Sequence, residues 1–395
     1  MSPSLVLPEI AAVHDEMVAL RRHIHAHPEL GFKEFATSDL VAQRLEEWGY
    51  RVTRGVGQTG VVATLQRGPG KSLGIRADMD ALPIAETTGL PHASTHAGVM
   101  HACGHDFHTS VMLGAAHLLK AREADLPGMV RIFFQPAEET FNGARHLIDA
   151  GALDNVAAVF GLHNAPELPT GTFATRAGPF YANVDRFQIL ITGKGAHAAK
   201  PEQGVDTIVT ASQIVGALQT LPSRSFSSLE SLVVSVTRIE GGNTWNVLPQ
   251  TVELEGTVRT HSDAVRRQVP DKIRQVIDGV AAALGAQAEL RWQPGPPAVI
   301  NDPHWAAFSK TVAAEAGYRV EEAELQMGGE DFALYLHHVP GVFVSIGSAS
   351  EFGLHHPRFN PDERALFPAA QYFTLLAERT LQQLTTAPEK ALSNA

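Results

Sequence analysis

The first part of the chain alternates short apolar runs with stretches of helical spacing. Val13, Met17, Leu20 and Ile24 recur at helical intervals and predict a first amphipathic helix. The apolar runs that predict strands are residues 60–66, 72–82, 128–139 and 156–164. The stretches that predict further helices are residues 37–50, 108–123 and 141–153. This alternation favours an α/β domain built on a largely parallel central sheet.

Polar side chains gather where these predicted strands end. Asp78 and Asp80 follow one strand, and Glu138 and Glu139 follow the next. His163 comes at the end of a third strand. Open α/β sheets bind their ligands at the edge where the carboxyl ends of the strands meet. We therefore expect these side chains to share one crevice.

The pattern changes near residue 182. From there, strands and helices follow in the order β-α-β-β-α-β, which is typical of a ferredoxin-like fold. The proline-rich residues 294–297 close this unit. A chain of 395 residues is also long for a single hydrophobic core. The sequence thus predicts a larger domain of residues 1–181 and 295–395, into which a smaller satellite domain, residues 182–294, is inserted.

Charge and hydropathy narrow the classes of partner. The chain has 31 basic and 42 acidic residues and a formal net charge of −11, so we expect no basic face for nucleic acid or an anionic membrane. No apolar stretch approaches the roughly 20 residues that cross a bilayer. Residues 1–10 lack the basic flank and apolar core of a signal peptide. One cysteine and no export signal favour the cytoplasm.

The segment GVGQTG, residues 55–60, matches the glycine pattern of dinucleotide-binding loops. That pattern requires a helix directly after the glycines, whose N-terminus holds the pyrophosphate. Here the apolar run of residues 60–66 follows and predicts a strand instead. The segment is therefore interpreted as the turn of a β-hairpin.

The stretch MHACGHDFH, residues 100–108, places the chain's one cysteine among three histidines. Cys103 has no partner for an internal disulfide, so it is a buried apolar residue, a nucleophile or a metal ligand. In a loop, Cys103 and His105 can both reach one ion. A thiolate and a neutral imidazole suit zinc, cobalt, nickel or manganese. A buried cysteine beside a core histidine, and a cysteine hydrolase with His105 as base, stay open as alternatives.

Donors after other predicted strands strengthen the metal interpretation. In QPAEE, Glu138 and Glu139 diverge on irregular backbone, so one can bind a metal while the other moves protons. An acidic helix N-terminus is the structural alternative. His163 follows an apolar strand, and His355 and His356 lie in a loop before the last helix. A thiolate, a carboxylate and three imidazole sites suffice for two metals that hold a water between them.

A series of motifs along the chain resembles those of a known family. They are, in order, RRHIHAHPELGF, IRADMDALPI, MHACGHDFHTSVMLGAA, FQPAEE, GLHN, GKGAHAAKP, NVLP, GTVR and GGEDFA. The series extends over roughly residues 14–385 and resembles the N-acyl-amino-acid amidohydrolases of the hippurate hydrolase type, which include plant auxin-conjugate hydrolases. Those belong to a metallopeptidase clan with carboxypeptidase G and aminoacylase.

The resemblance implies a zinc-peptidase-like catalytic domain with an inserted satellite domain. It also implies two divalent metal ions per subunit, zinc, manganese, cobalt or nickel. By motif position, the ligands would be Cys103, His105, Glu139, His163 and His356. Glu138 would be the general base, and His355 is expected to be the histidine of its pair that does not bind metal.

The resemblance gives further residues supporting roles. His197 and Asn246, on the satellite domain, would reach a catalytic site, often that of a neighbouring subunit, and help to stabilise the oxyanion. The protein would accordingly be a homo-oligomer, a dimer or tetramer, that associates through the satellite domain. Apart from the resemblance, the guanidinium of Arg259 is interpreted as a bidentate partner for the substrate carboxylate, with a strand-end surface charge as the alternative. Carboxypeptidase G-like members carry a histidine ligand at the position where this chain has Asp78. This chain resembles a cysteine-containing subgroup that differs from them, and here we expect Asp80 to orient a metal ligand.

The expected activity is hydrolysis of the amide bond of N-acyl amino acids, such as N-acetyl or N-benzoyl amino acids. In this scheme a metal-bound water, with its pKa lowered to around 7, loses a proton to Glu138 and attacks the acyl carbonyl. Glu138 then protonates the leaving amine. A dipeptidase or aminopeptidase on the same scaffold, and a non-catalytic metal-binding homologue, are the alternatives.

Overall fold

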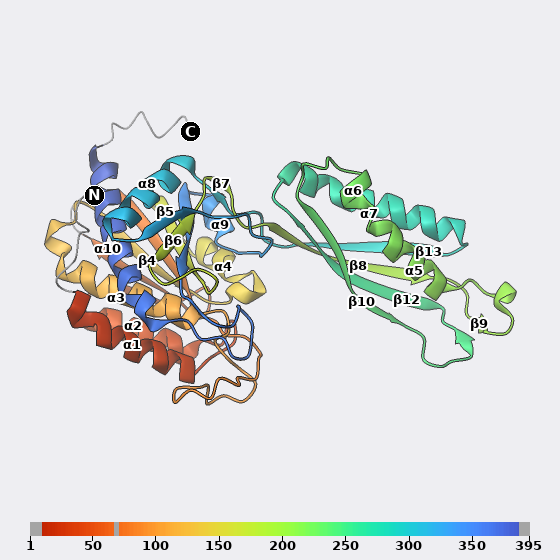
Figure 1. Cartoon of the computed structure of the whole chain (residues 1–395), viewed down its shortest axis with the longest axis horizontal. Coiled ribbons are helices and arrows are strands. Elements are labelled where there is room, and N and C mark those ends of the chain that lie inside the picture. Colours follow the sequence, from red (N-terminus) through yellow and green to blue (C-terminus); the bar gives the residue numbers. More distant parts are fainter. Residues whose placement is uncertain (1–9, 67–70, 387–395) are drawn as a thin grey trace. The chain divides into compact units, whose positions relative to one another are not determined.

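The chain divides into two units in a computed structural model that describes residues 10–66 and 71–386 (Figure 1). The larger unit runs through Gly178 and includes Ile300–Glu324 and the chain from Asp331 onward. The smaller unit comprises Pro179–Val299 and Leu325–Glu330. The expectation that the N-terminus is not a signal peptide concerns residues 1–10, of which residues 1–9 lie outside the described residues. Of the helices in the described part, none has the length and apolar character needed to cross a membrane.

The larger unit is built on a mixed sheet with the strand order β1-β2-β4-β3-β5-β16-β6-β15. Its strands are β1 (Arg51–Val56), β2 (Gly60–Gln66), β3 (Ser72–Asp78), β4 (Met129–Gln135), β5 (Val156–Ala165), β6 (Thr172–Thr175), β15 (Arg319–Glu322) and β16 (Gly341–Gly347). β3 is parallel to β4 and β5, and β5 is parallel to β16. The pairs β1/β2, β2/β4 and β6/β16 are antiparallel. The predicted α/β class with a largely parallel sheet is confirmed.

Two details of this sheet follow from the hydrophobic pattern. Every residue of β3 is buried, as expected for a central parallel strand with both faces covered. β1 and β2 form an antiparallel hairpin in which Val56 pairs with Gly60. The predicted β-hairpin is therefore confirmed, with its turn at residues 57–59, and the dinucleotide-binding alternative is excluded at that segment.

Helices cover the sheet of the larger unit. They are α1 (Ile10–Ala26), α2 (Phe35–Glu47), α3 (His105–Ala121), α4 (Gly143–Asp149), α8 (Pro303–Glu315), α9 (Ala333–Leu336) and α10 (Leu366–Thr386), with 3₁₀ turns at Glu123–Asp125, Glu138–Thr140 and Glu363–Ala365. α1, α3 and α10 pack on one another, and α3 and α10 contact β3. Phe107, Phe134 and Phe160 are fully buried in the core between these elements. The short strands β7 (Gly178–Pro179) and β14 (Ile300–Asn301) lie where the chain passes from one unit to the other.

The smaller unit has an antiparallel sheet with the order β10-β12-β8-β13. Its elements are β8 (Asn183–Thr192), β9 (Ala196–His197), the 3₁₀ turn Pro201–Gln203, α5 (Thr207–Leu218), α6 (Leu221–Arg224), β10 (Leu232–Gly241), β11 (Val247–Leu248), β12 (Thr251–Thr260), α7 (Asp263–Ala283) and β13 (Gln287–Pro294). Alternate residues of β12 are buried, because one face of the sheet packs against α5 and α7. The predicted ferredoxin-like order is confirmed.

The smaller unit extends beyond the residues from which its order was predicted. Leu325–Glu330 belongs to it, although the sequence assigned this stretch to the larger domain. The reason is backbone pairing, which a hydrophobic pattern does not reveal: Gln326 N donates to Phe180 O at 2.8 Å, and Ala182 N donates to Gly328 O at 3.0 Å.

Candidate metal centre

The polar residues that follow β3, β4 and β5 meet at one edge of the larger unit's sheet. The three strands are parallel neighbours, so their carboxyl ends lie side by side. Asp78 ends β3, Glu138 begins the 3₁₀ turn after β4, and His163 lies near the end of β5. Cys103 and His105 join them at the beginning of α3. Segments far apart in sequence thus supply donors to one place.

The first group of donors is Cys103, His105 and His163. All three are buried, and their donor atoms lie within 4.8 Å of one another. Cys103 Sγ is 3.4 Å from His163 Nε2. His163 Nδ1 lies 2.7 Å from the carbonyl oxygen of Asn164, and because a carbonyl only accepts, Nδ1 carries the proton. His163 Nε2 therefore has a lone pair directed toward Cys103.

A glycine makes this arrangement possible. Gly104 has a φ of +89°, a left-handed conformation, and a Cβ at this position would lie 2.3 Å from Asn164 Nδ2. Asn164 Nδ2 donates to the carbonyl of Cys103 at 2.6 Å. The loop between Cys103 and α3 is thereby held against β5.

Asp80 connects His105 to the pair of adjacent glutamates. Its Oδ1 is 3.2 Å from His105 Nδ1, which must donate because a carboxylate only accepts. The backbone N–H groups of Glu138 and Glu139 donate to Asp80 Oδ1 and Oδ2, each at 3.0 Å. His105 Nε2 then lies 3.6 Å from Asp78 Oδ2 and 4.0 Å from Glu139 Oε1. Asp80 is therefore placed to orient an imidazole and both carboxylates together.

The donor chemistry of this cluster fits divalent cations. Within the described residues, His105 Nε2 and Glu139 Oε1 are buried and make no hydrogen bond, although both point into the cluster. Overlapping groups share these residues: Cys103 with His105 and His163, His105 with Glu138 and Glu139, and Cys103 with Glu139 and a loop histidine. Thiolate, imidazole and carboxylate donors suit zinc and its borderline neighbours. The groups could hold two ions.

Negative charge is in excess at this site. Burial and then the charges of Glu139 and Glu138 raise the pKa of the Cys103 thiol well above its usual value. Burial opposes a charge on His105, but Asp78 and then Asp80 raise its pKa to about 10. Neighbouring buried carboxylates contribute to both shifts: they add to the effect of burial at Cys103 and outweigh it at His105. A divalent cation would offset this negative charge and favour the thiolate.

A buried arginine lies beneath the donors. Arg76, fully buried on β3, donates to Asp78 Oδ2 at 2.7 Å and to Asp331 Oδ1 at 2.9 Å. His108 Nδ1 lies 2.6 Å from Asp78 Oδ1. The backbone N–H of Asp331 points to Glu138 Oε1 at 3.4 Å. Arg76 thereby neutralises part of the negative charge of Asp78 and Asp331, and the N–H of Asp331 holds the carboxylate of Glu138.

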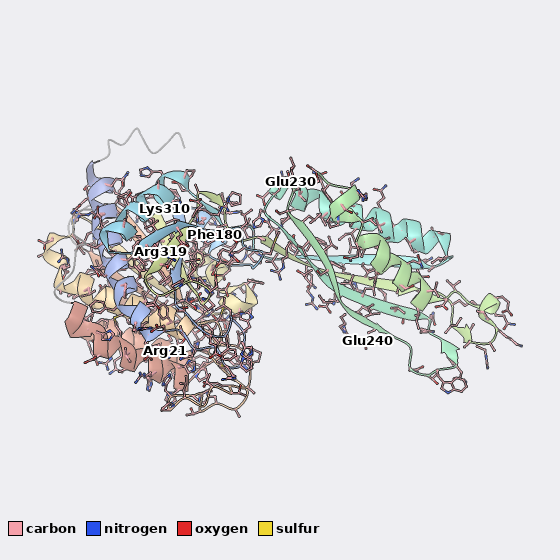
Figure 2. All side chains as sticks on the ribbon, in the orientation of Figure 1. Arg21, Phe180, Glu230, Glu240, Lys310 and Arg319 are labelled. Carbon is pink, nitrogen blue, oxygen red and sulfur yellow. The ribbon has the colours of Figure 1, made fainter. Side chains whose placement is uncertain are left out.

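α1 contributes a second buried arginine. Arg21, labelled in Figure 2, is fully buried, and its Nε donates to Asp106 Oδ2 at 2.8 Å. His25 Nδ1 lies 2.9 Å from the same oxygen. Asp106 follows His105 in the first turn of α3, so these contacts fix the beginning of that helix.

The histidine loop differs from the sequence-based expectation, which chose His356 as a ligand. His355 Nε2 lies 3.4 Å from Glu139 Oε1, and His355 belongs to the donor group with Cys103 and Glu139. The ring of His356 instead stacks on Phe352, with centroids 4.5 Å apart. His355 has a φ of +63°, and its N–H donates to the carbonyl of Ala102 at 2.7 Å. This left-handed backbone conformation brings His355 to the donors. Because the two adjacent residues are both histidines, the sequence does not show which of them it affects.

The predicted residues of the smaller unit lie within that unit. β9 and β11 form a short two-stranded arm in which His197 pairs with Val247 (Figure 1). Ala198 N donates to the carbonyl of Asn246 at 3.0 Å, so His197 and Asn246 belong to the same arm. Arg259 lies on β12, where its Nε donates to Thr257 Oγ1 at 3.1 Å.

Sequence reasoning gave no role to two buried charges beside the donors. Arg76 interrupts an otherwise apolar strand, and an isolated charge in a buried run is a signal that could have revealed it. Asp331 belongs to the motif GGEDFA, but nothing in the sequence connects it to Arg76 or Glu138. Their partnership depends on the tertiary fold.

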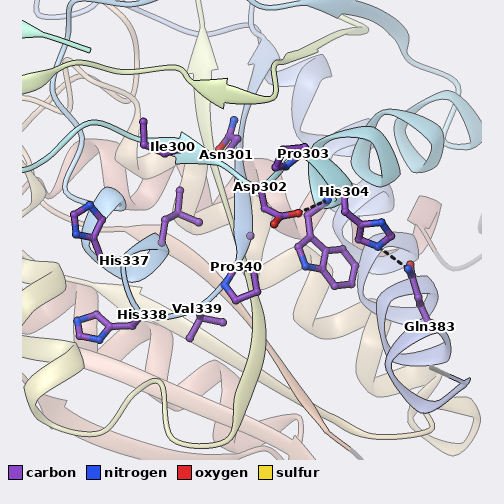
Figure 3. Close-up of a pocket in the computed structure, with 13 residues that line it drawn as sticks. Ile300, Asn301, Asp302, Pro303, His304, His337, His338, Val339, Pro340 and Gln383 are labelled. Carbon is purple, nitrogen blue, oxygen red and sulfur yellow. Dashed lines mark hydrogen bonds between the residues drawn. The ribbon is translucent and has the colours of Figure 1, made fainter. Parts of the chain in front are cut away.

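A separate cavity of about 710 Å³ lies elsewhere in the larger unit (Figure 3). Several of its polar lining residues bond to neighbours: Asp302 accepts from Trp305 N at 2.9 Å, and His304 Nε2 lies 2.6 Å from Gln383 Nε2. None of the candidate metal donors lines it. The cavity is therefore distinct from the donor cluster.

Comparison with known proteins adds to this geometry. The chain is 48% identical over 376 residues to an N-acetylcysteine deacetylase of Bacillus subtilis (strain 168), a match that covers 94% of this chain and 99% of that protein. It is 39% identical over 381 residues to the IAA-amino acid hydrolase ILR1-like 4 of Arabidopsis thaliana, covering 94% of this chain and 87% of that protein.

A solved structure is similar to this chain in fold as well as in sequence. The crystal structure of the Bacillus subtilis YXEP protein, described as a dinuclear metal binding peptidase, matches with a TM-score of 0.85 and 45% identity. The match covers 94% of this chain and 99% of that one. The sequence pattern of peptidase family M20/M25/M40 matches residues 74–379. With donors at the strand ends and relatives matched over almost their whole length, the chain belongs to peptidase family M20/M25/M40.

Proposed function

We propose that the protein is a metal-dependent amidohydrolase that cleaves the amide bond of N-acyl amino acids. The observation that carries the proposal is the set of overlapping donor groups that share Cys103, His105 and Glu139 and stand directly beside Glu138. Relatives named as a deacetylase and as an IAA-amino acid hydrolase support amide hydrolysis, and the dinuclear metal binding peptidase supports two metal ions. Retention of an acid beside the complete donor set argues against a non-catalytic homologue.

In this proposal the residues that hold two divalent ions are Cys103, His105, Glu139, His163 and His355. The ions, when bound, supply the Lewis acid that polarises the acyl carbonyl and makes water acidic enough to react. Glu138 takes a proton from that water and returns it to the leaving amine. Asp80 keeps His105 Nδ1 protonated, so that Nε2 stays available as a donor.

Residues of the smaller unit complete the proposal. His197 and Asn246, from the β9/β11 arm, contribute to oxyanion stabilisation in a catalytic site, and Arg259 holds the substrate carboxylate. The protein acts in the cytoplasm, since a single cysteine used as a metal donor suits a reducing compartment. Cell fractionation that finds it in an exported fraction would contradict this location.

The proposed oligomer forms through the smaller unit. Within the described residues, its four-stranded sheet ends in two edge strands, β10 and β13, which can pair with a second copy. Sedimentation equilibrium is expected to give the mass of a dimer or tetramer. A monomer at every concentration tested would contradict this part of the proposal.

The function is tested by hydrolysis assays on metal-free and metal-loaded protein. N-acetyl, N-benzoyl and indole-acyl amino acids are compared with dipeptides that carry a free α-amine. We expect chelation to abolish amide hydrolysis, added zinc, manganese, cobalt or nickel to restore it, and thiol alkylation of the metal-loaded protein to leave it largely intact. Preference for the dipeptides would favour an aminopeptidase, and a fully metal-loaded protein inert on all substrates would reject the enzyme.

The role of Glu138 is tested by Glu138→Gln. The amide keeps the shape of the side chain but cannot take a proton, so we expect kcat to fall by about 10²- to 10⁴-fold. Bound metal, measured by elemental analysis, is expected to stay at the wild-type level. Glu47→Gln, at a solvent-facing position of α2, is the matched control. Wild-type turnover in Glu138→Gln would exclude this role.

The two adjacent histidines provide a matched pair. His355→Ala removes a donor next to Glu139, and we expect metal affinity to fall by more than ~10-fold. His356→Ala removes a ring that stacks on Phe352 and accepts a hydrogen bond from Arg358 N, and neither contact involves a candidate metal donor, so metal affinity should stay close to that of the wild type. Competition with a chromogenic chelator measures both. The reverse ranking would return the ligand role to His356.

A further inference from the structure

The loop after α1 reaches the turn that carries the catalytic acid. This turn, Ala137–Phe141, is called the carboxylate turn below. Gly31 packs closely against it: a Cβ at residue 31 would lie 3.1 Å from Ala137 Cα. The approach brings Glu34, the residue directly before α2, to the beginning of the carboxylate turn. Neither Gly31 nor Glu34 belongs to a donor group.

Successive backbone N–H groups of the carboxylate turn donate to buried carboxylates. Ala137 N donates to Glu34 Oε1 at 2.9 Å. The next two N–H groups, those of Glu138 and Glu139, donate to the two oxygens of Asp80. Glu34 and Asp80 thus accept hydrogen bonds from three consecutive N–H groups of the turn. The two carboxylates together satisfy the first three N–H groups of the turn, which are too early in it to find backbone partners.

The backbone of the carboxylate turn needs such contacts. Ala137 has φ +54° and ψ +40°, and Phe141 has φ +56°, so a non-glycine residue in the left-handed region stands at each end. Such conformations persist only where the surroundings impose them. The hydrogen bond from Ala137 to Glu34 acts on the first of these residues, immediately before Glu138.

Glu34 is itself held in place. It is fully buried, and Thr59 Oγ1 donates to its Oε2 at 2.5 Å. The carboxyl group is therefore fixed by one hydrogen bond on each oxygen. Its hydrogen bonds are to the backbone of the turn and to Thr59, and neither partner is the side chain of a candidate metal donor.

We propose that Glu34 is a positioning residue: by accepting the Ala137 N–H, it fixes the backbone of the carboxylate turn and so the placement of Glu138 for proton transfer. This inference rests on the proposed function. Burial raises the pKa of Glu34 to about 7, against the hydrogen bond from Thr59. An Oε1 acceptor is present in both the ionised and the protonated form, so the role needs the hydrogen bond and not the charge. A glutamine amide should therefore replace it.

The test compares Glu34→Ala, Glu34→Gln and the wild type at saturating metal. For Glu34→Ala we expect kcat to fall about 10- to 100-fold, because a displacement of about 1 Å at a reacting group has an effect of that order. KM and bound metal should stay within about twofold, since ground-state binding is not removed. Glu34→Gln should keep kcat within about threefold of the wild type, because its oxygen still accepts the Ala137 N–H.

Glu29→Ala is the matched control. Glu29 lies in the same loop and accepts hydrogen bonds from Ala36 N, Thr37 N and Thr37 Oγ1, but not from the carboxylate turn. Its loss should therefore leave kcat close to that of the wild type. A fall in kcat equal to that of Glu34→Ala would mean that the loop acts only through general stability, and would overturn the positioning role.

Two further results would overturn the proposal: wild-type kcat in folded Glu34→Ala, or a loss in Glu34→Gln as large as in Glu34→Ala. If the alanine variant does not fold, Glu34→Asp takes its place. Aspartate keeps a carboxyl group but is one methylene too short to reach Ala137 N, so wild-type kcat there would also reject the role. A wild-type protein that is inactive on every N-acyl amino acid would reject the proposed function instead.

Discussion

The structure depends on the balance of charge at the carboxyl ends of three parallel strands. Asp78, Asp80 and Glu138 are almost completely buried there, and Glu139 lies beside them. Like charges repel strongly where water is excluded. Arg76 and backbone N–H groups bond to these carboxylates, and the remaining negative charge surrounds donors that suit divalent metals. The same buried carboxylates therefore determine both the local fold and the capacity to bind metal.

The adjacent glutamates show how one short turn can divide two tasks. Both N–H groups bond to Asp80, so the backbone of the pair is fixed as a unit. Their side chains then diverge: Glu139 faces His105 and His355, whereas Glu138 lies against the N–H of Asp331. In the proposed function, this divergence keeps Glu139 as a metal donor and Glu138 as a proton carrier in separate positions, provided that the turn does not move.

Much of this arrangement could be predicted from the sequence. The alternation of apolar runs and helical stretches predicts the α/β sheet and the ferredoxin-like unit, because burial imposes those periods directly. Polar residues after β3, β4 and β5 point to one edge, since parallel strands end together. The type and spacing of Cys103 and His105 suggest metal binding before any coordinates are known.

Other features depend on the tertiary fold and were not accessible from pattern alone. His355 lies near Glu139 because the backbone turns into the left-handed region at His355, whereas the ring of His356 stacks on Phe352. Arg76 Nη2 lies 2.9 Å from Asp331 Oδ1, although the two residues are distant along the chain. The extension of the smaller unit by Leu325–Glu330 likewise follows from backbone hydrogen bonds to a remote segment.

The central claim is that these donors bind paired divalent cations. Anomalous scattering from crystals of the metal-loaded protein, recorded on both sides of the absorption edge of the added metal, tests it most directly. The account predicts two neighbouring peaks whose ligands are the side chains of Cys103, His105, Glu139, His163 and His355, with Glu138 beside them. Peaks elsewhere, or no peak among these five side chains in a protein that has bound metal, would contradict it.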